Sequence, residues 1–213
     1  MILHQRPIHA ILAASVAAVL ALGAGTATAE PAAPAKDAAT AQVEKLHAAL
    51  IQVMQSADEL GYDGRFDALA PVVGDTFDLP FMASKSVGRH WKSLEDADRA
   101  RWNDVFVRLI TANYAGRFDG FSGQHFETTG AEDAINNTRV VMTRLVIPGD
   151  EDVQLNYRLR EVDGSWRIID IYLNGTVSEL ALRRSEYSAV LQREGFEKLL
   201  TTLNDKVDEL RKG

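Results

Sequence analysis

The residues that could carry chemistry are few in this sequence and lie far apart. Beyond the first residues the histidines are His47, His90 and His125, and none has the HxxxH or HExxH spacing of a metal site. The chain has no cysteine, no GxSxG motif and no P-loop. Surface or helix-end positions explain the three histidines better than metal ligation does. The sequence therefore predicts no metal and no cofactor.

One carboxylate differs from the rest, because Asp170 stands in the apolar run from Trp166 to Leu173. Burial could raise its pKa enough for acid–base work. The alternative is a structural aspartate that pairs with an arginine or accepts backbone hydrogen bonds at the edge of a sheet. No second catalytic group accompanies it in the sequence, which favours the structural role. The nearby pair Arg183-Arg184 is typical of a solvated helix face, although it could also meet an acidic head group or partner.

These residues belong to a stretch, 166–191, in which the apolar period changes from two to about 3.6. We therefore expect a strand that leads into a helix starting near Ser178. If the strand alternates strictly, Ile169, Ile171 and Leu173 share one face, and Trp166, Ile168 and Tyr172 share the other. Because both faces are mostly apolar, we expect a binding site between this strand's sheet and the helix that crosses it.

The remaining elements follow from periodicity and turn residues. An amphipathic helix from Asp37 should stop at Gly61, a short helix should follow Asp78, and a helix capped at Ser93 should end at Gly116. Strands are expected at 124–129, 138–147, 153–162 and 166–173, before further C-terminal helices. The order predicts an α+β fold, in which a curled four-stranded antiparallel sheet is covered by the N- and C-terminal helices.

Such a sheet with helices across it forms a cone, which becomes an apolar cavity if side chains do not fill it. We expect sheet residues to form the floor of the cavity and helix residues to form its wall and roof. The predicted floor is Tyr157, Leu159, Ile169, Ile171 and Leu173, and the predicted wall and roof are Phe81, Phe106, Leu109, Ile110 and Tyr114.

The N-terminal residues form a separate segment. An Ala/Leu/Val run after Arg6, followed by Ala27-Thr28-Ala29, predicts a signal peptide over 1–29, a flexible Pro-containing leader over 30–36 and one domain over 37–213. Export without any cysteine fits a bacterial periplasm. The net charge of −7 argues against nucleic acid as a partner.

Several segments resemble the toluene-tolerance or MlaC family of periplasmic phospholipid-binding proteins. The similarity is carried by the strand 164–171, by Gly175, by Val177-Ser178 and by Arg184-Ser185-Glu186-Tyr187. It extends over roughly Asp37 to Lys206. The extra Thr176, and Leu182-Arg183 where an aromatic often precedes the arginine, are closest to the hopanoid-associated HpnM branch. The resemblance therefore leaves the lipid open between a phospholipid and a hopanoid-type lipid.

The resemblance implies an NTF2-like cone that holds lipid tails and carries the lipid between membranes without catalysis. Its implied partners are the lipid, the substrate-receiving domain of an inner-membrane ABC transporter and an outer-membrane acceptor complex. Two other hypotheses stay open. One is a small NTF2-like periplasmic enzyme that uses Asp170 as general base, and the other is a structural adaptor with a filled core.

Overall fold

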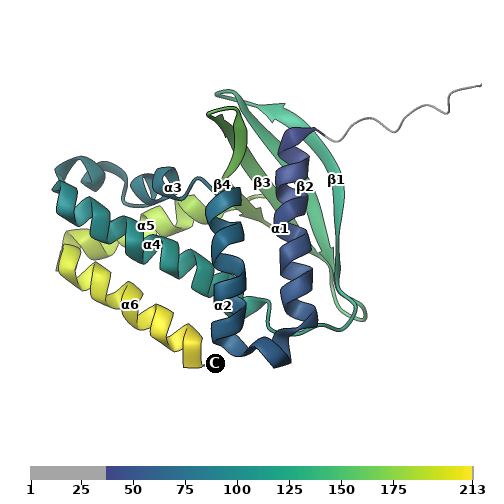
Figure 1. Ribbon diagram of the computed structural model, residues 1–213. Helices are drawn as coiled ribbons and strands as arrows, with labels where there is room; N and C mark the ends of the chain where they lie inside the picture. The colour runs from purple at the N-terminus through teal and green to yellow at the C-terminus, as the bar shows by residue number, and fades with distance from the viewer. Residues whose placement is uncertain (1–36, 213) are drawn as a thin grey trace, which may run out of the picture. The chain divides into compact units, whose positions relative to one another are not determined.

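Helices, then strands, then helices follow one another in Figure 1, a computed structural model that describes residues 37–212. The predicted signal peptide and leader lie outside these residues. The helices are α1 (Ala38–Gln55), α2 (Ala57–Thr76), α3 (Leu79–Ser86), the 3-10 helix η1 (Gly88–Ser93), α4 (Asp96–Arg117), α5 (Glu179–Glu194) and α6 (Phe196–Lys212). The strands are β1 (His125–Ala134), β2 (Thr138–Val146), β3 (Val153–Val162), β4 (Ser165–Leu173) and β5 (Val177–Ser178).

The strands form one antiparallel sheet in the order β1-β2-β3-β4-β5, which does not close into a barrel. The predicted α+β class is confirmed, but the predicted count of four strands is short by one. The fifth strand has two residues, with Val177 opposite Leu173 and Ser178 opposite Tyr172. A strand this short has no hydrophobic period, so the sequence pattern could not reveal it.

The two hairpins on either side of β4 are set by turn residues with positive φ. Asp163 and Gly164 have φ of 51° and 76°, and Asn174 and Gly175 have φ of 49° and 75°. Asp-Gly and Asn-Gly are the dipeptides that a type I′ turn favours, since both central residues need φ above zero. Asp163-Gly164 is a two-residue loop, whereas Asn174-Gly175 is followed by Thr176 before Val177 pairs with Leu173. The turns therefore fix the register on both edges of β4.

A β-bulge interrupts the alternation that the sequence predicts for β4. Arg158 lies opposite Asp170, yet Leu159 lies opposite Ile168, so Ile169 is one extra residue on β4. Ile168, and not Ile169, therefore takes the place beside Leu159 in the core. The strict alternation that put Ile169 on the same face as Ile171 is wrong for this reason.

The helix ends differ from prediction in two places. The first helix ends at Gln55 rather than Gly61, and Gly61 instead forms a kink with φ of 57° inside α2. The helix α4 begins at Asp96 without a side-chain cap, because the hydroxyl of Ser93 donates to the carbonyl of His90 and does not reach the helix. The N-terminus of α1 does have its cap, since Asp37 accepts from the amides of Ala39 and Thr40 at 3.1 Å each.

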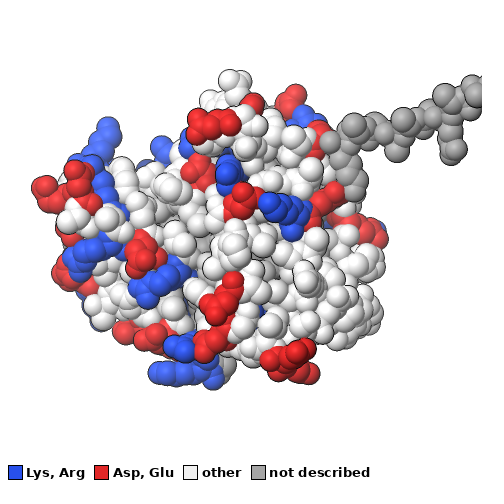
Figure 2. All heavy atoms as spheres, in the orientation of Figure 1, with Lys and Arg blue, Asp and Glu red and all other residues white. Residues whose placement is uncertain are grey.

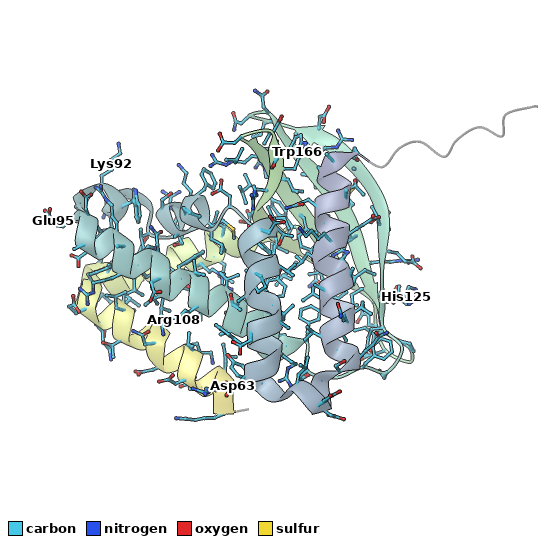
Figure 3. All side chains as sticks on the ribbon, in the orientation of Figure 1. Asp63, Lys92, Glu95, Arg108, His125 and Trp166 are labelled. Carbon is cyan, nitrogen blue, oxygen red and sulfur yellow. The ribbon has the colours of Figure 1, made fainter. Side chains whose placement is uncertain are left out.

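The N-terminal half of α4 lies in the close-packed part of the core. Trp102 is fully buried, its indole N–H donates to the carbonyl of Ala83 at 2.9 Å, and its ring packs edge-on against Tyr187 at 5.5 Å. Polar contacts add to this packing at the surface: Arg108 of α4 donates to Asn204 of α6, and Asp63 of α2 pairs with Arg211 at the end of α6 (Figure 3). By contrast, α5 buries only one residue, Tyr187.

The surface of the described residues is charged and mixed. Acidic and basic side chains are interspersed over the face in Figure 2. None of the helices between residues 37 and 212 combines the length and the apolar composition that crossing a membrane requires.

Candidate functional site

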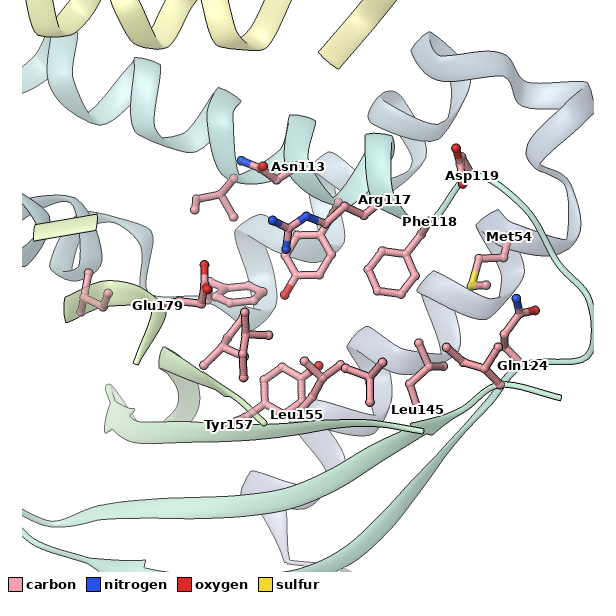
Figure 4. A pocket seen from close by; sticks show the side chains of 18 of the residues that line it. Met54, Asn113, Arg117, Phe118, Asp119, Gln124, Leu145, Leu155, Tyr157 and Glu179 are labelled. Carbon is pink, nitrogen blue, oxygen red and sulfur yellow. The ribbon is translucent and has the colours of Figure 1, made fainter. Parts of the chain in front are cut away.

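A cavity of about 350 Å³ lies between the sheet and the helices (Figure 4). This volume is at the lower end of the range for small-molecule sites, about 300–1,000 Å³. The walls are mostly apolar. The strands and the residue after β2 contribute Leu145, Ile147, Val153, Leu155, Ile171 and Leu173, and the helices and the residues next to them contribute Met54, Phe77, Met82, Ile110, Tyr114 and Phe118.

Polar side chains also line the cavity, and several of them reach the surface. Arg117, Asp119 and Gly120, at the end of α4 and just after it, line the cavity and are exposed, so the cavity communicates with solvent there. On the α5 side, Arg183 pairs with Glu179 at 3.5 Å and donates to the hydroxyl of Tyr187 at 3.2 Å. Arg117 forms no ion pair within residues 37–212. The mouth therefore places a cation, Arg117, and a carboxylate, Asp119, beside an apolar interior.

Tyr157 marks the inner end of the cavity. Its hydroxyl and the Nε2 of His47 form a hydrogen bond of 3.1 Å, and the His47 ring stacks on Phe126 at 3.8 Å. Burial raises the pKa of Tyr157 well above its usual value and lowers the pKa of His47 to about 3. Both groups are therefore neutral at neutral pH, and their bond serves to hold α1 against the sheet.

The predicted cavity residues fall into three groups. Ile110, Tyr114, Tyr157, Ile171 and Leu173 line the cavity. Phe81 and Ile169 line a second pocket, which the bulge in β4 explains for Ile169. Phe106, Leu109 and Leu159 line neither and are at most 2% exposed in the close-packed core.

Sequence reasoning missed several lining residues. Leu155 of β3 could have been found from the sequence, because it lies on the same face of the strand as Tyr157 and Leu159. Leu145 pairs with Val153 across β2 and β3, which needs the register and not only the period. Phe118 and Phe77 each follow the end of a helix, where no hydrophobic period marks a residue as inward-facing.

Asp170 is occupied by structural hydrogen bonds. Its Oδ1 accepts from the amides of Ile171 at 2.9 Å and Leu180 at 3.1 Å, and its Oδ2 accepts from the hydroxyl of Ser178 at 2.6 Å. Ser178 in turn accepts from the amide of Ala181 and caps α5. This arrangement matches the structural alternative, since the carboxylate accepts three hydrogen bonds that anchor the start of α5, and its neighbour Ser178 serves as the cap of that helix. No cluster of three or more metal-ligating side chains occurs in the described residues.

An open antiparallel sheet that encloses an apolar cavity with its helices defines a binding domain for an apolar ligand. A model of the MlaC protein family matches residues 44–205. The chain therefore belongs to the MlaC family, and the family predicted from the sequence is confirmed.

A solved structure supports the fold. The phospholipid-binding protein from Ralstonia solanacearum, determined in complex with a phospholipid, is 19% identical and superposes with a TM-score of 0.71. The match covers 82% of this chain and 99% of that chain. At this identity the likeness shows the fold alone. No curated protein matched the sequence.

Proposed function

We propose that this protein is a periplasmic carrier that holds a lipid by its tails in the cavity between sheet and helices. The observation that carries the proposal is the apolar cavity itself, which reaches the surface beside Arg117. Its occupant needs an apolar body, because the walls are mostly apolar, and it can have an anionic end, because Arg117 at the mouth forms no ion pair in residues 37–212. A lipid with an acidic head group has both features.

Burial of the tails supplies the free energy of binding. Each methylene removed from water contributes about 0.8 kcal/mol, so a tail of about ten methylenes would contribute about 8 kcal/mol before the cost of ordering it. Few polar groups of the protein face the interior, so little desolvation opposes this term. The cavity thus favours an acyl or other hydrocarbon tail over a polar metabolite.

The family and the neighbour support the finer parts of the proposal. Proteins of the MlaC family are periplasmic, and the Ralstonia solanacearum protein of this fold was solved with a phospholipid. We propose that the carrier exchanges its lipid with the substrate-receiving domain of an inner-membrane ABC transporter and with an outer-membrane acceptor. The lipid is a phospholipid or, following the HpnM-like departures around Thr176, a hopanoid-type lipid.

The direct test is mass spectrometry of lipids extracted from the protein after purification from its native periplasm. We expect about one lipid per cavity, and its mass will distinguish a diacyl phospholipid from a hopanoid. Asp170→Asn should keep its lipid, because that carboxylate does not line the cavity. Protein that carries no lipid and takes up none from vesicles would contradict the proposal and favour the adaptor.

Shuttling makes a second demand, because a carrier must release its partners. Its contacts with both membrane components should be weak and in the small-interface class, below about 1,200 Å². Analytical ultracentrifugation of the mature protein with each soluble partner domain should show fast exchange. A permanent complex with either one would contradict shuttling while leaving lipid binding intact.

A further inference from the structure

A second pocket, of about 480 Å³, lies on the other side of the first turn of α5 and has a different chemistry. Leu180 lines both pockets. The two adjacent arginines line different ones, since Arg183 lines the apolar cavity and Arg184 lines the second pocket. We propose that the second pocket is a binding site for a phosphate group, distinct from the lipid cavity. The proposal goes beyond the carrier function and does not depend on it.

Four cations from three elements converge on this pocket: Lys85 of α3, Arg158 and Arg160 of β3, and Arg184 of α5. Within residues 37–212 only Arg160 has a carboxylate partner, Asp78, whose Oδ2 accepts from the Nε of Arg160 at 2.6 Å. In the described residues Lys85, Arg158 and Arg184 form no ion pair. On a chain with net charge −7, this leaves a local excess of positive charge in one concave place.

The one carboxylate in the pocket does not cancel this charge by direct pairing. Asp170 lies opposite Arg158 in the sheet, but its oxygens accept from Ser178 and from two backbone amides instead. The two residues form no ion pair. The guanidinium of Arg158 therefore lines the pocket without a carboxylate partner in the described residues.

Neutral groups hold one of the cations by hydrogen bonds, and backbone packs closely against another. Arg158 donates from Nε to the hydroxyl of Thr138 at 2.9 Å and from Nη2 to the carbonyl of Ile135 at 3.1 Å. Arg184 lies directly over Gly88, where a Cβ would stand 2.8 Å from its Nε. Gly88 also has φ of 56°, so a side chain there is disfavoured twice. Positions fixed in this way reduce the entropy lost when an anion binds.

The aromatic ring of Phe81 supports the same cations. The guanidinium of Arg160 lies 4.1 Å from the ring centroid, and the ammonium of Lys85 lies 5.1 Å from it. Asn136 and Thr138 add polar groups to the wall. Arginine forks and a lysine that converge in a concave site suit a compact tetrahedral oxyanion, which accepts several charge-assisted hydrogen bonds at once. An acidic peptide would instead need cations spread along a groove.

The phosphate could be free or could belong to the head group of a glycerophospholipid. Isothermal titration calorimetry of the mature chain at low ionic strength, with inorganic phosphate and then with glycerol 3-phosphate, tests the site. We expect saturable binding that weakens as salt rises. Tighter binding of glycerol 3-phosphate, with retention on phosphatidylglycerol vesicles, assigns the phosphate to a head group. Equal binding of both compounds without vesicle retention assigns it to free phosphate.

The variants target the two cations that make no structural hydrogen bond. Lys85→Gln with Arg184→Gln should weaken phosphate binding by about tenfold or more, because charge-assisted hydrogen bonds are lost. Arg193→Gln, at an exposed arginine of the same helix that forms no ion pair in residues 37–212, is the charge-matched control for Arg184→Gln alone and should bind like wild type. If the double variant is unstable, Arg184→Gln alone serves.

Absence of saturable phosphate binding to the wild-type chain would overturn the proposal. So would equal affinity in the double variant and in Arg193→Gln. The copurified lipid should be the same in all these variants, because neither Lys85 nor Arg184 lines the cavity. Failure of the carrier function would appear as missing lipid in the wild type, and failure of the phosphate site as missing phosphate binding.

Discussion

The two ends of β3 and β4 present the same face to the helices, yet one end is packed and the other is hollow. At one end Leu159 and its partner Ile168 have no exposed surface and belong to the core. At the other end Leu155 and its partner Leu173 line the cavity. All four are aliphatic and of one size. The difference therefore comes from what covers them and not from their own chemistry.

Helix α4, which packs mainly against α6, α2 and α3, shows the same division. In α4 Phe106 and Leu109 are packed against other helices, whereas Ile110 and Tyr114 line the cavity. Packing density in a protein interior is normally close to that of organic crystals, so an unfilled half is a property that needs an occupant or a function. Apolar patterning therefore determines which face points inward, but it does not determine whether other side chains fill the space in front of that face.

The sharpest test is a pair of truncations on one strand. Leu159→Ala should lower the free energy of unfolding by about 2–5 kcal/mol, because it leaves a new cavity in a packed region. Leu155→Ala should cost clearly less, since part of its surface already faces the hollow. Denaturant unfolding of lipid-free protein measures both, because bound lipid would add its own stabilisation. Equal losses would mean that the two ends are packed alike.

The wall between the two pockets can be tested at Asp170. Asp170→Asn should cost about 1.5–3 kcal/mol, because the hydrogen bonds to the charged carboxylate at the start of α5 are weakened. The matched control, Asp205→Asn on the exposed face of α6, should change stability by less than about 0.5 kcal/mol. Thermal or denaturant unfolding provides the readout. A neutral Asp170→Asn variant would show that this carboxylate does not anchor α5.

Larger side chains should also distinguish the packed end of the sheet from the hollow end. Leu109→Trp should overpack the core and destabilise the protein by about 1–3 kcal/mol. Leu173→Trp should cost less and should displace lipid, because its side chain can enter the cavity. Denaturant midpoint and lipid content should be measured on the same preparations. If Leu109→Trp lost lipid at unchanged stability, the cavity would extend into the region that we describe as packed.

The stability of the protein should depend on pH through His47, whose bond to Tyr157 lies between the two ends. Burial lowers the pKa of His47 from 6.5 to about 3, so between these two pH values the unfolded state binds a proton and the folded state does not. Stability from this group is complete above pH 6.5 and declines toward pH 3, by about 2 kcal/mol between pH 7 and pH 5. His47→Gln should lose this slope when unfolding is measured at both pH values. An equal slope in the variant would assign the pH dependence to other groups.

Much of the fold follows from local rules. The turn pairs Asp163-Gly164 and Asn174-Gly175 fix the hairpins, and the alternation in β3 identifies its inward face. What the sequence could not show is non-local. The bulge at Ile169 depends on the register with β3, and β5 depends on a pairing of two residues.

Where the predicted site residues lie in the structure depends on packing that a local pattern does not contain. Ile110 and Leu109 are neighbours on one helix with the same apolar character, but only Ile110 lines the cavity. Which of them meets empty space depends on how α2, α3 and α6 pack against α4, and α6 lies far from α4 in the sequence. The Arg183-Arg184 pair shows the same limit, since a pattern of two adjacent charges cannot tell that they serve different pockets.

Helix α5 is packed less deeply than α4, and this affects how a ligand can enter and leave. This helix separates the two pockets and buries one residue, whereas α4 buries eight. Local opening requires the least free energy where the fewest apolar contacts are broken, so the amides of α5 should exchange with deuterium sooner than those of α4. A ligand too large for the resting volume could then enter through brief departures of this one segment, while the rest of the molecule stays folded.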